Sequence, residues 1–321
     1  MSRAENANFS TADTMDITIK NLAKHYGLQT AVDHIDMQVK TGEVLGFLGP
    51  NGAGKTTTMK MVCGLIAPDD GSIEVGGISV QKNPSKVKEL IGYLPENNPL
   101  YEDMPVLDLL RFTADIQGVP KDRTNERIKK MVEACGLGDE KHKRIGELSK
   151  GYRQRVGMAQ AMVHDPEVLI LDEPTTGLDP NQIVEIRKLI KQIGKEKTVI
   201  LSTHILPEVE ATCDRILIIN KGKIVADGSP GALRKQAQGR SLIRTRIEGA
   251  STDVMLKSFS EHALFSSADI HDDGLMELAT SDMTTAAREV FRICVAKNWT
   301  LLELTPIETR LEDVFRDLTL N

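Results

Sequence analysis

Short runs of apolar residues recur along the first two thirds of the chain, and segments with helical spacing lie between them. The runs at 43–48, 168–171, 198–202 and 216–219 are almost wholly apolar, which is typical of parallel strands buried on both faces. Between 106 and about 164 the apolar residues recur at helical spacing instead: Leu107, Leu110, Ala114 and Ile116, then Ile128, Met131, Val132 and Cys135. Apolar strands that alternate with helices predict an α/β fold with a parallel sheet.

The same pattern divides the chain into two domains. Further strands are expected at 16–19, 32–39 and 71–77, and the stretch at 228–239, rich in turn-forming and small polar residues, indicates a boundary. Beyond it, strands at 242–247, 275–279 and 300–304 and helices at 284–297 and 310–318 predict a small α+β domain. We therefore expect a disordered tail at 1–15, a main domain at 16–235 with a helical subdomain at about 97–165, and an accessory domain at 240–321.

Composition narrows the classes of partner. The chain has 46 acidic and 40 basic residues and a net charge of −6, and without a basic stripe this balance argues against a nucleic-acid partner. The tail lacks the apolar run of a signal peptide, and no stretch is apolar for long enough to span a bilayer. Any membrane role is therefore expected to come through a partner. The four scattered cysteines are expected to be buried free thiols in a reducing compartment.

One loop carries the chemistry of phosphate binding. The residues of the G-x-x-x-x-G-K-[ST] pattern and its neighbour are Gly49, Pro50, Asn51, Gly52, Ala53, Gly54, Lys55, Thr56 and Thr57. Glycines let backbone N–H groups approach phosphate oxygens, the lysine provides a positive charge for the β- and γ-phosphates, and the Thr56 hydroxyl is placed to hold Mg²⁺. The strand before the loop and the helix expected at 56–65 give it the context that such a site requires.

Two acids and a histidine follow other buried strands. Asp172 and Glu173 end the run at 168–171, at the sheet edge where ligands of parallel sheets bind. Asp172 suits the Mg²⁺ shell, through water, and Glu173 could orient and deprotonate an attacking water. A solvated acidic turn is the alternative. His204 follows the strand at 198–202 and could bridge the γ-phosphate and Glu173, although a lone histidine is more often structural.

A further helix begins near Ser149, within the segment Leu148-Ser149-Lys150-Gly151-Tyr152. Ser149 fits the N-cap position, and a helix start with Ser and Gly can offer hydrogen-bond donors to an anion. Its spacing alone fits a capped surface helix equally well.

Together and in this order, these motifs resemble those of the ATP-binding subunits of ABC (ATP-binding cassette) transporters. The resemblance covers about residues 17–229, with Walker A at 49–56, the signature at 148–152, Walker B at 169–173, the D-loop at 177–179 and the switch His204. It implies a P-loop NTPase with a RecA-like core that binds ATP and Mg²⁺ and hydrolyses ATP. It also implies that Tyr26 stacks on adenine, with a core tyrosine as the alternative, and that Asp179 acts in the D-loop.

The chain departs from the family pattern at two places. The usual signature LSGGQ is replaced by LSKGY, so Lys150 and Tyr152 stand for Gly and Gln, while Ser149 and Gly151 are kept. Glu96 stands where the family has a glutamine; it can still ligate Mg²⁺ but adds a negative charge beside ATP. Both variants resemble single-cassette exporters of drugs, antibiotics, ions or lipids, including gliding-motility-type cassettes, and the tail at 311–315 resembles the end of their extra domain.

The resemblance also implies partners. Signature residues Ser149, Lys150, Gly151 and Tyr152 would act in trans on ATP held by a second ATPase subunit, either another copy or a paralogue. The receiver of the cycle would be an integral-membrane permease on a separate chain, which places this subunit in the cytoplasm on the inner face of the cell membrane. A soluble ABC ATPase acting on ribosomes or DNA is the main alternative, but such relatives usually carry two cassettes or long coiled coils. A small-molecule kinase would need neither signature nor switch.

Overall fold

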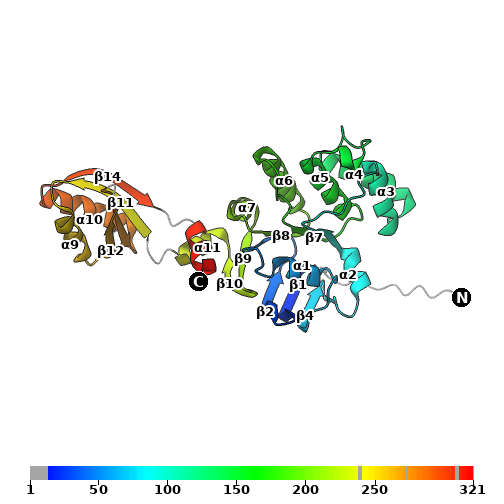
Figure 1. Ribbon diagram of the computed structural model, residues 1–321, viewed down its shortest axis with the longest axis horizontal. Coiled ribbons are helices and arrows are strands. Elements are labelled where there is room, and N and C mark those ends of the chain that lie inside the picture. The colour runs from blue at the N-terminus through cyan, green and yellow to red at the C-terminus, as the bar shows by residue number, and fades with distance from the viewer. Residues whose placement is uncertain (1–13, 238–240, 272–273, 308–310, 321) are drawn as a thin grey trace. The chain divides into compact units, whose positions relative to one another are not determined.

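In the computed structural model, the described residues are 14–237, 241–271, 274–307 and 311–320. The chain divides between Asp227 and Gly228 into two compact units, which are drawn with their elements in Figure 1. The tail expected at 1–15 falls, up to residue 13, outside the described residues.

A six-stranded sheet forms the centre of the first unit. Its strands, in spatial order, are β10 (Lys223–Gly228), β9 (Arg215–Asn220), β3 (Val44–Leu48), β8 (Thr198–Thr203), β7 (Val168–Asp172) and β6 (Ile91–Leu94). The pairs from β9 to β6 are parallel. Every residue of β3, β7 and β8 is buried, so the parallel sheet predicted from the apolar runs is confirmed.

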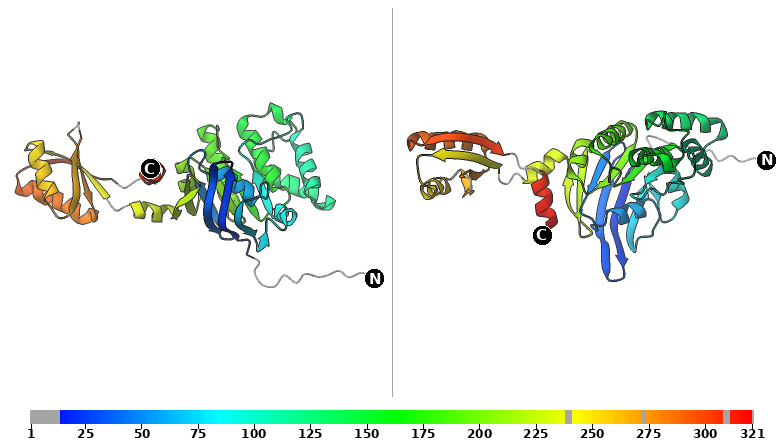
Figure 2. Two further views of the ribbon diagram at one scale, coloured as in Figure 1. Left: turned by 60° about the horizontal axis from the view of Figure 1, so that its bottom comes forward. Right: turned by 45° about the horizontal axis from the view of Figure 1, so that its top comes forward.

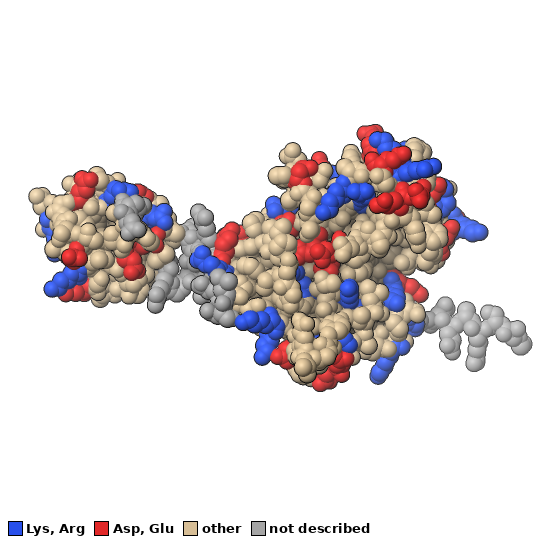
Figure 3. All heavy atoms as spheres, viewed as in Figure 1, with Lys and Arg blue, Asp and Glu red and all other residues tan. Residues whose placement is uncertain are grey.

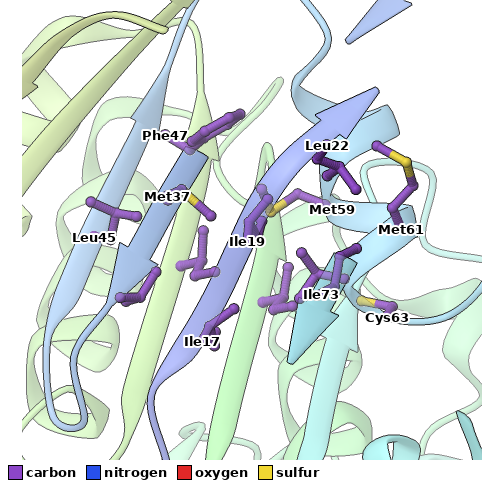
Figure 4. Packing of buried hydrophobic residues seen from close by; sticks show 14 of the residues in the cluster. Ile17, Ile19, Leu22, Met37, Leu45, Phe47, Met59, Met61, Cys63 and Ile73 are labelled. Carbon is purple, nitrogen blue, oxygen red and sulfur yellow. The ribbon is translucent and has the colours of Figure 1, made fainter. Parts of the chain in front are cut away.

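A second, antiparallel sheet provides the other wall of the core. It contains β2 (Gln29–Val39), β1 (Ile17–Tyr26), β4 (Asp70–Val75) and β5 (Ile78–Ser79). Side chains from both sheets and from helix α1 (Lys55–Val62) form one apolar cluster, and Figure 4 shows Ile17, Ile19 and Phe47 within it. This packing fixes α1, and with it the loop that precedes α1, against the central sheet.

The remaining helices of this unit fall into two groups by their place in the chain, and Figure 2 shows them from two further directions. The helices that connect strands are α2 (Pro84–Leu90), α6 (Pro180–Ile193) and α7 (Leu206–Thr212). The helical part contains α3 (Val106–Ile116), α4 (Lys121–Ala134), the 3₁₀ turn η1 (Ile145–Glu147) and α5 (Lys150–Met162). Ile116, which recurs at helical spacing in the sequence, lies outside the core: it is 66% exposed, because the buried face of α3 runs through Val106, Leu109 and Leu110 and Ile116 is its last residue.

The second unit has α+β architecture, as the sequence predicts. Its antiparallel sheet has the order β12 (Phe265–Ile270), β13 (Met276–Thr280), β11 (Ser241–Glu248) and β14 (Thr300–Ile307). Its helices are α8 (Pro230–Ala237), α9 (Thr252–Ser260), α10 (Met283–Ala296) and α11 (Leu311–Leu320). Phe259, Phe265 and Val290 belong to a separate apolar core, so this unit has the means to fold around its own centre.

Candidate nucleotide-binding site

The loop between β3 and α1 is a tight backbone turn that only glycine permits at two positions. A Cβ atom at Gly49 would lie 2.4 Å from the carbonyl oxygen of Ile219, and one at Gly54 would lie 2.4 Å from that of Ala31. Gly54 also has a φ of 109° and caps the start of α1, a conformation that side chains disfavour. The sequence-predicted residues 49–57 therefore share one backbone cradle at a helix N-terminus, which is a site for phosphate groups.

Lys55 is held inside this cradle. Its Nζ donates hydrogen bonds to the carbonyl oxygens of Gly49, at 2.8 Å, and Pro50, at 3.2 Å. The same Nζ lies 3.4 Å from Oε1 of Glu173. The loop thus presents a buried positive charge where the β- and γ-phosphates of a bound nucleotide would need one.

Asp172 is the last residue of β7 and is fully buried. Neither of its carboxylate oxygens receives a hydrogen bond of normal geometry within the described residues, although the hydroxyls of Ser202 and Thr56 are near enough to lower its pKa. Burial is the larger effect and raises the pKa of the Asp172 carboxyl overall. A buried carboxylate without donors is costly unless a cation balances it.

These residues fit a magnesium ion that keeps most of its other ligands as water and phosphate. Mg²⁺ is usually bound by one or two protein oxygens together with nucleotide phosphates, and the buried Asp172 carboxylate and the Thr56 hydroxyl on α1 are such oxygens. The part of the chain that the structure describes holds no group of three or more His, Cys, Asp or Glu arranged around a metal, so a closed protein cage is not formed there. Glu96, the third expected ligand, is exposed and lines a cavity of about 500 Å³ together with Glu173 and Thr176.

The structure brings together Glu173 and His204, which are 31 residues apart in the sequence. Because β7 and β8 are adjacent and parallel, the residues that follow them meet at one sheet edge. His204 Nδ1 lies 2.9 Å from Oε2 of Glu173, and the hydroxyl oxygens of Thr176 and Thr203 lie 3.3 and 3.4 Å from the same carboxylate oxygen. Glu173 has a φ of 50°, a backbone conformation that is uncommon outside glycine and that concentrates at functional sites.

Three buried residues beside this pair escaped the sequence analysis. Thr175, Thr203 and Glu208 lie at or below 2% exposure, and both threonine hydroxyls donate to the Glu208 carboxylate. The available signal was weak: Glu208 falls at helical spacing with Thr212 and next to Val209, on the face of α7 that is buried.

The signature segment begins α5. Ser149 is the N-cap and its hydroxyl accepts from the backbone N–H of Tyr152 at 3.3 Å, so the predicted cap is confirmed. Gly151 is close to Gln182, since a Cβ atom at Gly151 would lie 2.6 Å from the Gln182 amide carbon. The Lys150 ammonium is close to Gly177, since a Cβ atom at Gly177 would lie 2.1 Å from Lys150 Nζ. Within one chain, the signature therefore borders the segment 177–182.

That neighbouring segment includes the predicted D-loop residue. Asp179 caps α6, and one carboxylate oxygen accepts from the backbone N–H groups of Asn181 and Gln182, each at 3.0 Å. The cap fixes the direction in which α6 leaves the acidic strand end of β7.

Tyr26 ends β1 and is 52% exposed. This exposure excludes the alternative of a core tyrosine and leaves the side chain accessible to a ligand. The Lys24 ammonium lies 5.7 Å from the ring centroid, so the ring already has a cation beside it.

Comparison with known proteins finds ATP-binding proteins of ABC transporters that match nearly the whole chain. The family model for ABC transporters matches residues 32–176. The bacitracin transport ATP-binding protein BcrA of Bacillus licheniformis is 36% identical over 93% of this chain and 95% of its own length. The linearmycin resistance ATP-binding protein LnrL of Bacillus subtilis is 33% identical over 94% of this chain and 97% of its own.

Solved structures agree in fold. An ATP-binding subunit of an ABC transporter superposes with a TM-score of 0.63 at 29% identity, covering 76% of this chain and 99% of that one. The cbiO1 protein of Clostridium perfringens, part of the ABC transporter complex cbiONQ, gives 0.63 at 31% identity, over 69% and 91%. Both confirm the P-loop NTPase fold expected from the motifs.

Proposed function

Since this chain belongs to the ATP-binding subunits of ABC transporters, we propose that its ATP hydrolysis drives export through a membrane permease carried on a separate chain. The observation that carries the proposal is the contact between Glu173 and His204 at the strand edge, beside the glycine loop and the buried Asp172. A carboxylate held by a histidine next to a phosphate cradle is suited to activating water.

The residues of the chain divide the work as follows. The loop at 49–57 binds the phosphates through its backbone, and Lys55 exchanges its carbonyl partners for the β- and γ-phosphate oxygens. Magnesium, held at Asp172 and Thr56, supplies charge neutralisation when bound. Glu173 orients a water and accepts its proton, while His204 holds the Glu173 carboxylate from the other side. Tyr26 stacks on the adenine.

The signature residues complete the site from a second subunit. Ser149 and Gly151 stand at the N-terminus of α5, where free backbone N–H groups and the helix dipole attract an anion. With one phosphate loop and one signature in the chain, two subunits are needed for two complete sites. ATP between them favours the closed dimer and hydrolysis weakens it.

The permease is proposed to dock where the helical part meets the central sheet. A cavity of about 310 Å³ opens there, lined by residues of β6, α3 and α5 and of the segments that follow β6 and α5, among them Tyr93, Pro95 and His164. The aromatic rings of Tyr101 and Phe112 pack edge to face with centroids 5.9 Å apart, and both side chains are exposed. Phe112 directly precedes Thr113, which lines the cavity, and aromatic side chains are enriched at protein interfaces. This docking places the subunit on the inner face of the cell membrane.

The surface charge of the chain favours export over action on nucleic acid. Acidic and basic side chains are interspersed on the face shown in Figure 3, in keeping with the net charge of −6. None of the helices described here has the length and apolarity to cross a bilayer, which is why the permease is assigned to another chain. The names of BcrA and LnrL refer to bacitracin transport and linearmycin resistance, and we extend to this chain only the export of such antibiotic-like compounds.

The test is a pull-down of the tagged chain from detergent-solubilised membranes of its own cell, with partners identified by mass spectrometry. We expect a multi-span permease to be recovered, and to be lost with Phe112→Ala. Phe291→Ala, which removes an exposed phenylalanine from the second unit (59% exposed, against 40% for Phe112), is the matched control and should retain it. Recovery of ribosomal or DNA-bound proteins without a permease would overturn the export proposal.

A further inference from the structure

Glu208 is a buried acid whose role the nucleotide site does not yet explain. It lies in the first turn of α7 and is 1% exposed. Oε1 accepts from the Thr175 hydroxyl at 2.5 Å, and Oε2 accepts from the Thr203 hydroxyl at 3.1 Å. Burying a carboxylate that accepts hydrogen bonds from two neutral hydroxyls costs free energy, and this cost suggests that Glu208 has a function.

The two threonines belong to the two segments that carry the proposed active-site pair. Thr175 lies two residues after Glu173, and Thr203 immediately precedes His204. Glu208 therefore joins the end of β7 to the end of β8 through one side chain. The left-handed backbone at Glu173 is the kind of conformation that persists only where its surroundings fix it.

The hydroxyl of Thr203 lies within hydrogen-bond distance of two carboxylates, those of Glu208 and Glu173. Its oxygen is 3.1 Å from Oε2 of Glu208 and 3.4 Å from Oε2 of Glu173. It carries a single hydrogen, so it can satisfy only one of them at a time. The shorter contact favours Glu208, and the Glu173 oxygen then keeps His204 at 2.9 Å as its nearest partner, with the Thr176 hydroxyl at 3.3 Å.

We propose that Glu208 is a positioning residue for ATP hydrolysis, which engages the Thr203 hydroxyl and so leaves Glu173 to His204 and the attacking water. The inference rests on the proposed function, because it takes Glu173 as the group that activates water. Without the Glu208 acceptor, the Thr203 hydroxyl turns to Glu173, weakens it as a base and competes with His204. Thr175 keeps the second oxygen of Glu208 in place.

The experiment compares Glu208→Met, Thr203→Val and the double variant in the full chain. Methionine keeps the volume of the side chain but accepts no ordinary hydrogen bond. We expect Glu208→Met to lower kcat about tenfold, the effect of misdirecting one hydrogen bond to a charged group, with the Kd for ATP unchanged. Adding Thr203→Val removes the competing hydroxyl and should restore kcat to the level of Thr203→Val alone. Glu126→Gln, an exposed acid on α4, is the control.

The rescue separates positioning from mere support of the fold. If Glu208 only stabilised the structure, the two substitutions would add, and the double variant would be no faster and less heat-stable than Glu208→Met. That result, or an unchanged kcat in Glu208→Met, overturns the proposal. Should Glu208→Met not fold, Glu208→Leu, which also accepts no hydrogen bond, takes its place, and the same rescue is expected with it.

Failure of the proposed function gives a different pattern. If Glu173→Gln hydrolyses ATP as fast as the unmodified chain, the assignment of Glu173 falls, and the positioning role falls with it. If Glu173→Gln is inactive but the Glu208 variants behave as the unmodified chain, only the role of Glu208 is wrong.

Discussion

The ammonium group of Lys55 lies 3.4 Å from Oε1 of Glu173, and the side chains are only 6% and 5% exposed. The lysine that is placed for phosphate thus pairs with the acid that is placed for water. A phosphate that draws Lys55 toward itself takes this partner from Glu173, whose other oxygen is held by His204. Binding of the nucleotide and readiness of the base are therefore linked through one ion pair.

Replacing Glu173 with glutamine should separate binding from turnover. The amide keeps the size of the side chain and can still contact His204, but it cannot accept a proton from water. We expect Glu173→Gln to bind ATP with an affinity within about threefold of the unmodified chain and to lose turnover by about 100-fold or more, the range of a missing general base. Equilibrium binding and steady-state phosphate release measure the two effects. Unimpaired hydrolysis would refute the role of Glu173.

Replacing Lys55 should weaken both nucleotide binding and the fold. Lys55→Met leaves Glu173 buried without its cation, and breaking a buried pair in this way costs about 3–5 kcal/mol of unfolding free energy. Urea denaturation measures the loss, and Lys55→Met combined with Glu173→Gln should recover much of it. The control Lys129→Met removes an exposed i,i+4 pair with Glu133 and should cost under about 1 kcal/mol. Equal losses for both lysines would contradict the coupling.

The glycine loop should not tolerate a single methyl group at its first position. Gly49→Ala places a Cβ 2.4 Å from the backbone oxygen of Ile219, and backbone cannot move aside as a side chain can. We expect a loss of about 1–3 kcal/mol in stability and no thermal stabilisation by ATP. Gly138→Ala, where nothing lies within 4 Å of the added atom, is the control and should change neither. ATP protection that survives in Gly49→Ala would show that the loop can open.

The parts of the site that are contiguous in sequence were predictable, because the loop at 49–57 carries its own geometry in its glycines. The meeting of Glu173 and His204 depends on the order of strands in space, which the apolar runs alone do not fix. The sequence analysis could suggest the contact only because each residue follows a buried strand of the predicted parallel sheet. The burial of Glu208 could not be predicted from the sequence, because a glutamate in a short helix is ordinarily exposed and only the packing of α7 buries it.

In the fold too, features carried by contiguous residues could be predicted, whereas features that depend on spatial neighbours could not. The strand expected at 16–19 extends to Tyr26, because its pairing with β2 continues through register shifts between Ile19 and His25 until Gly27, with a φ of 60°, turns the chain into β2. In the second unit the sequence analysis missed α8, which lies within the boundary stretch expected at 228–239, and also α9 and β12. The latter contains Ser266, Ser267 and Asp269, polar residues that give a strand little signal until its partner β13 is known.

The four cysteines should resist alkylation while the chain is folded. All are buried free thiols, and burial raises the pKa of each, to about 12 for Cys135. A raised pKa means that at pH 8 the folded chain holds less of the reactive thiolate than an exposed cysteine would. Mass spectrometry after iodoacetamide treatment should find no label in the native chain and four labels in urea. Rapid labelling without denaturant would show that the folded chain opens readily around one of these cysteines.

Tyr26 should contribute to recognition of the base and leave phosphate recognition unchanged. Its ring is half exposed at the end of β1, and stacking on a nucleobase is worth about 1–3 kcal/mol in other proteins. We expect Tyr26→Ala to weaken ATP binding by about tenfold and to leave the binding of magnesium tripolyphosphate, which has no base, unchanged. Tyr26→Phe keeps the ring and should bind ATP normally. Calorimetry with both ligands distinguishes the outcomes: if Tyr26→Ala weakens ATP and tripolyphosphate equally, the ring shapes the phosphate loop and does not contact adenine.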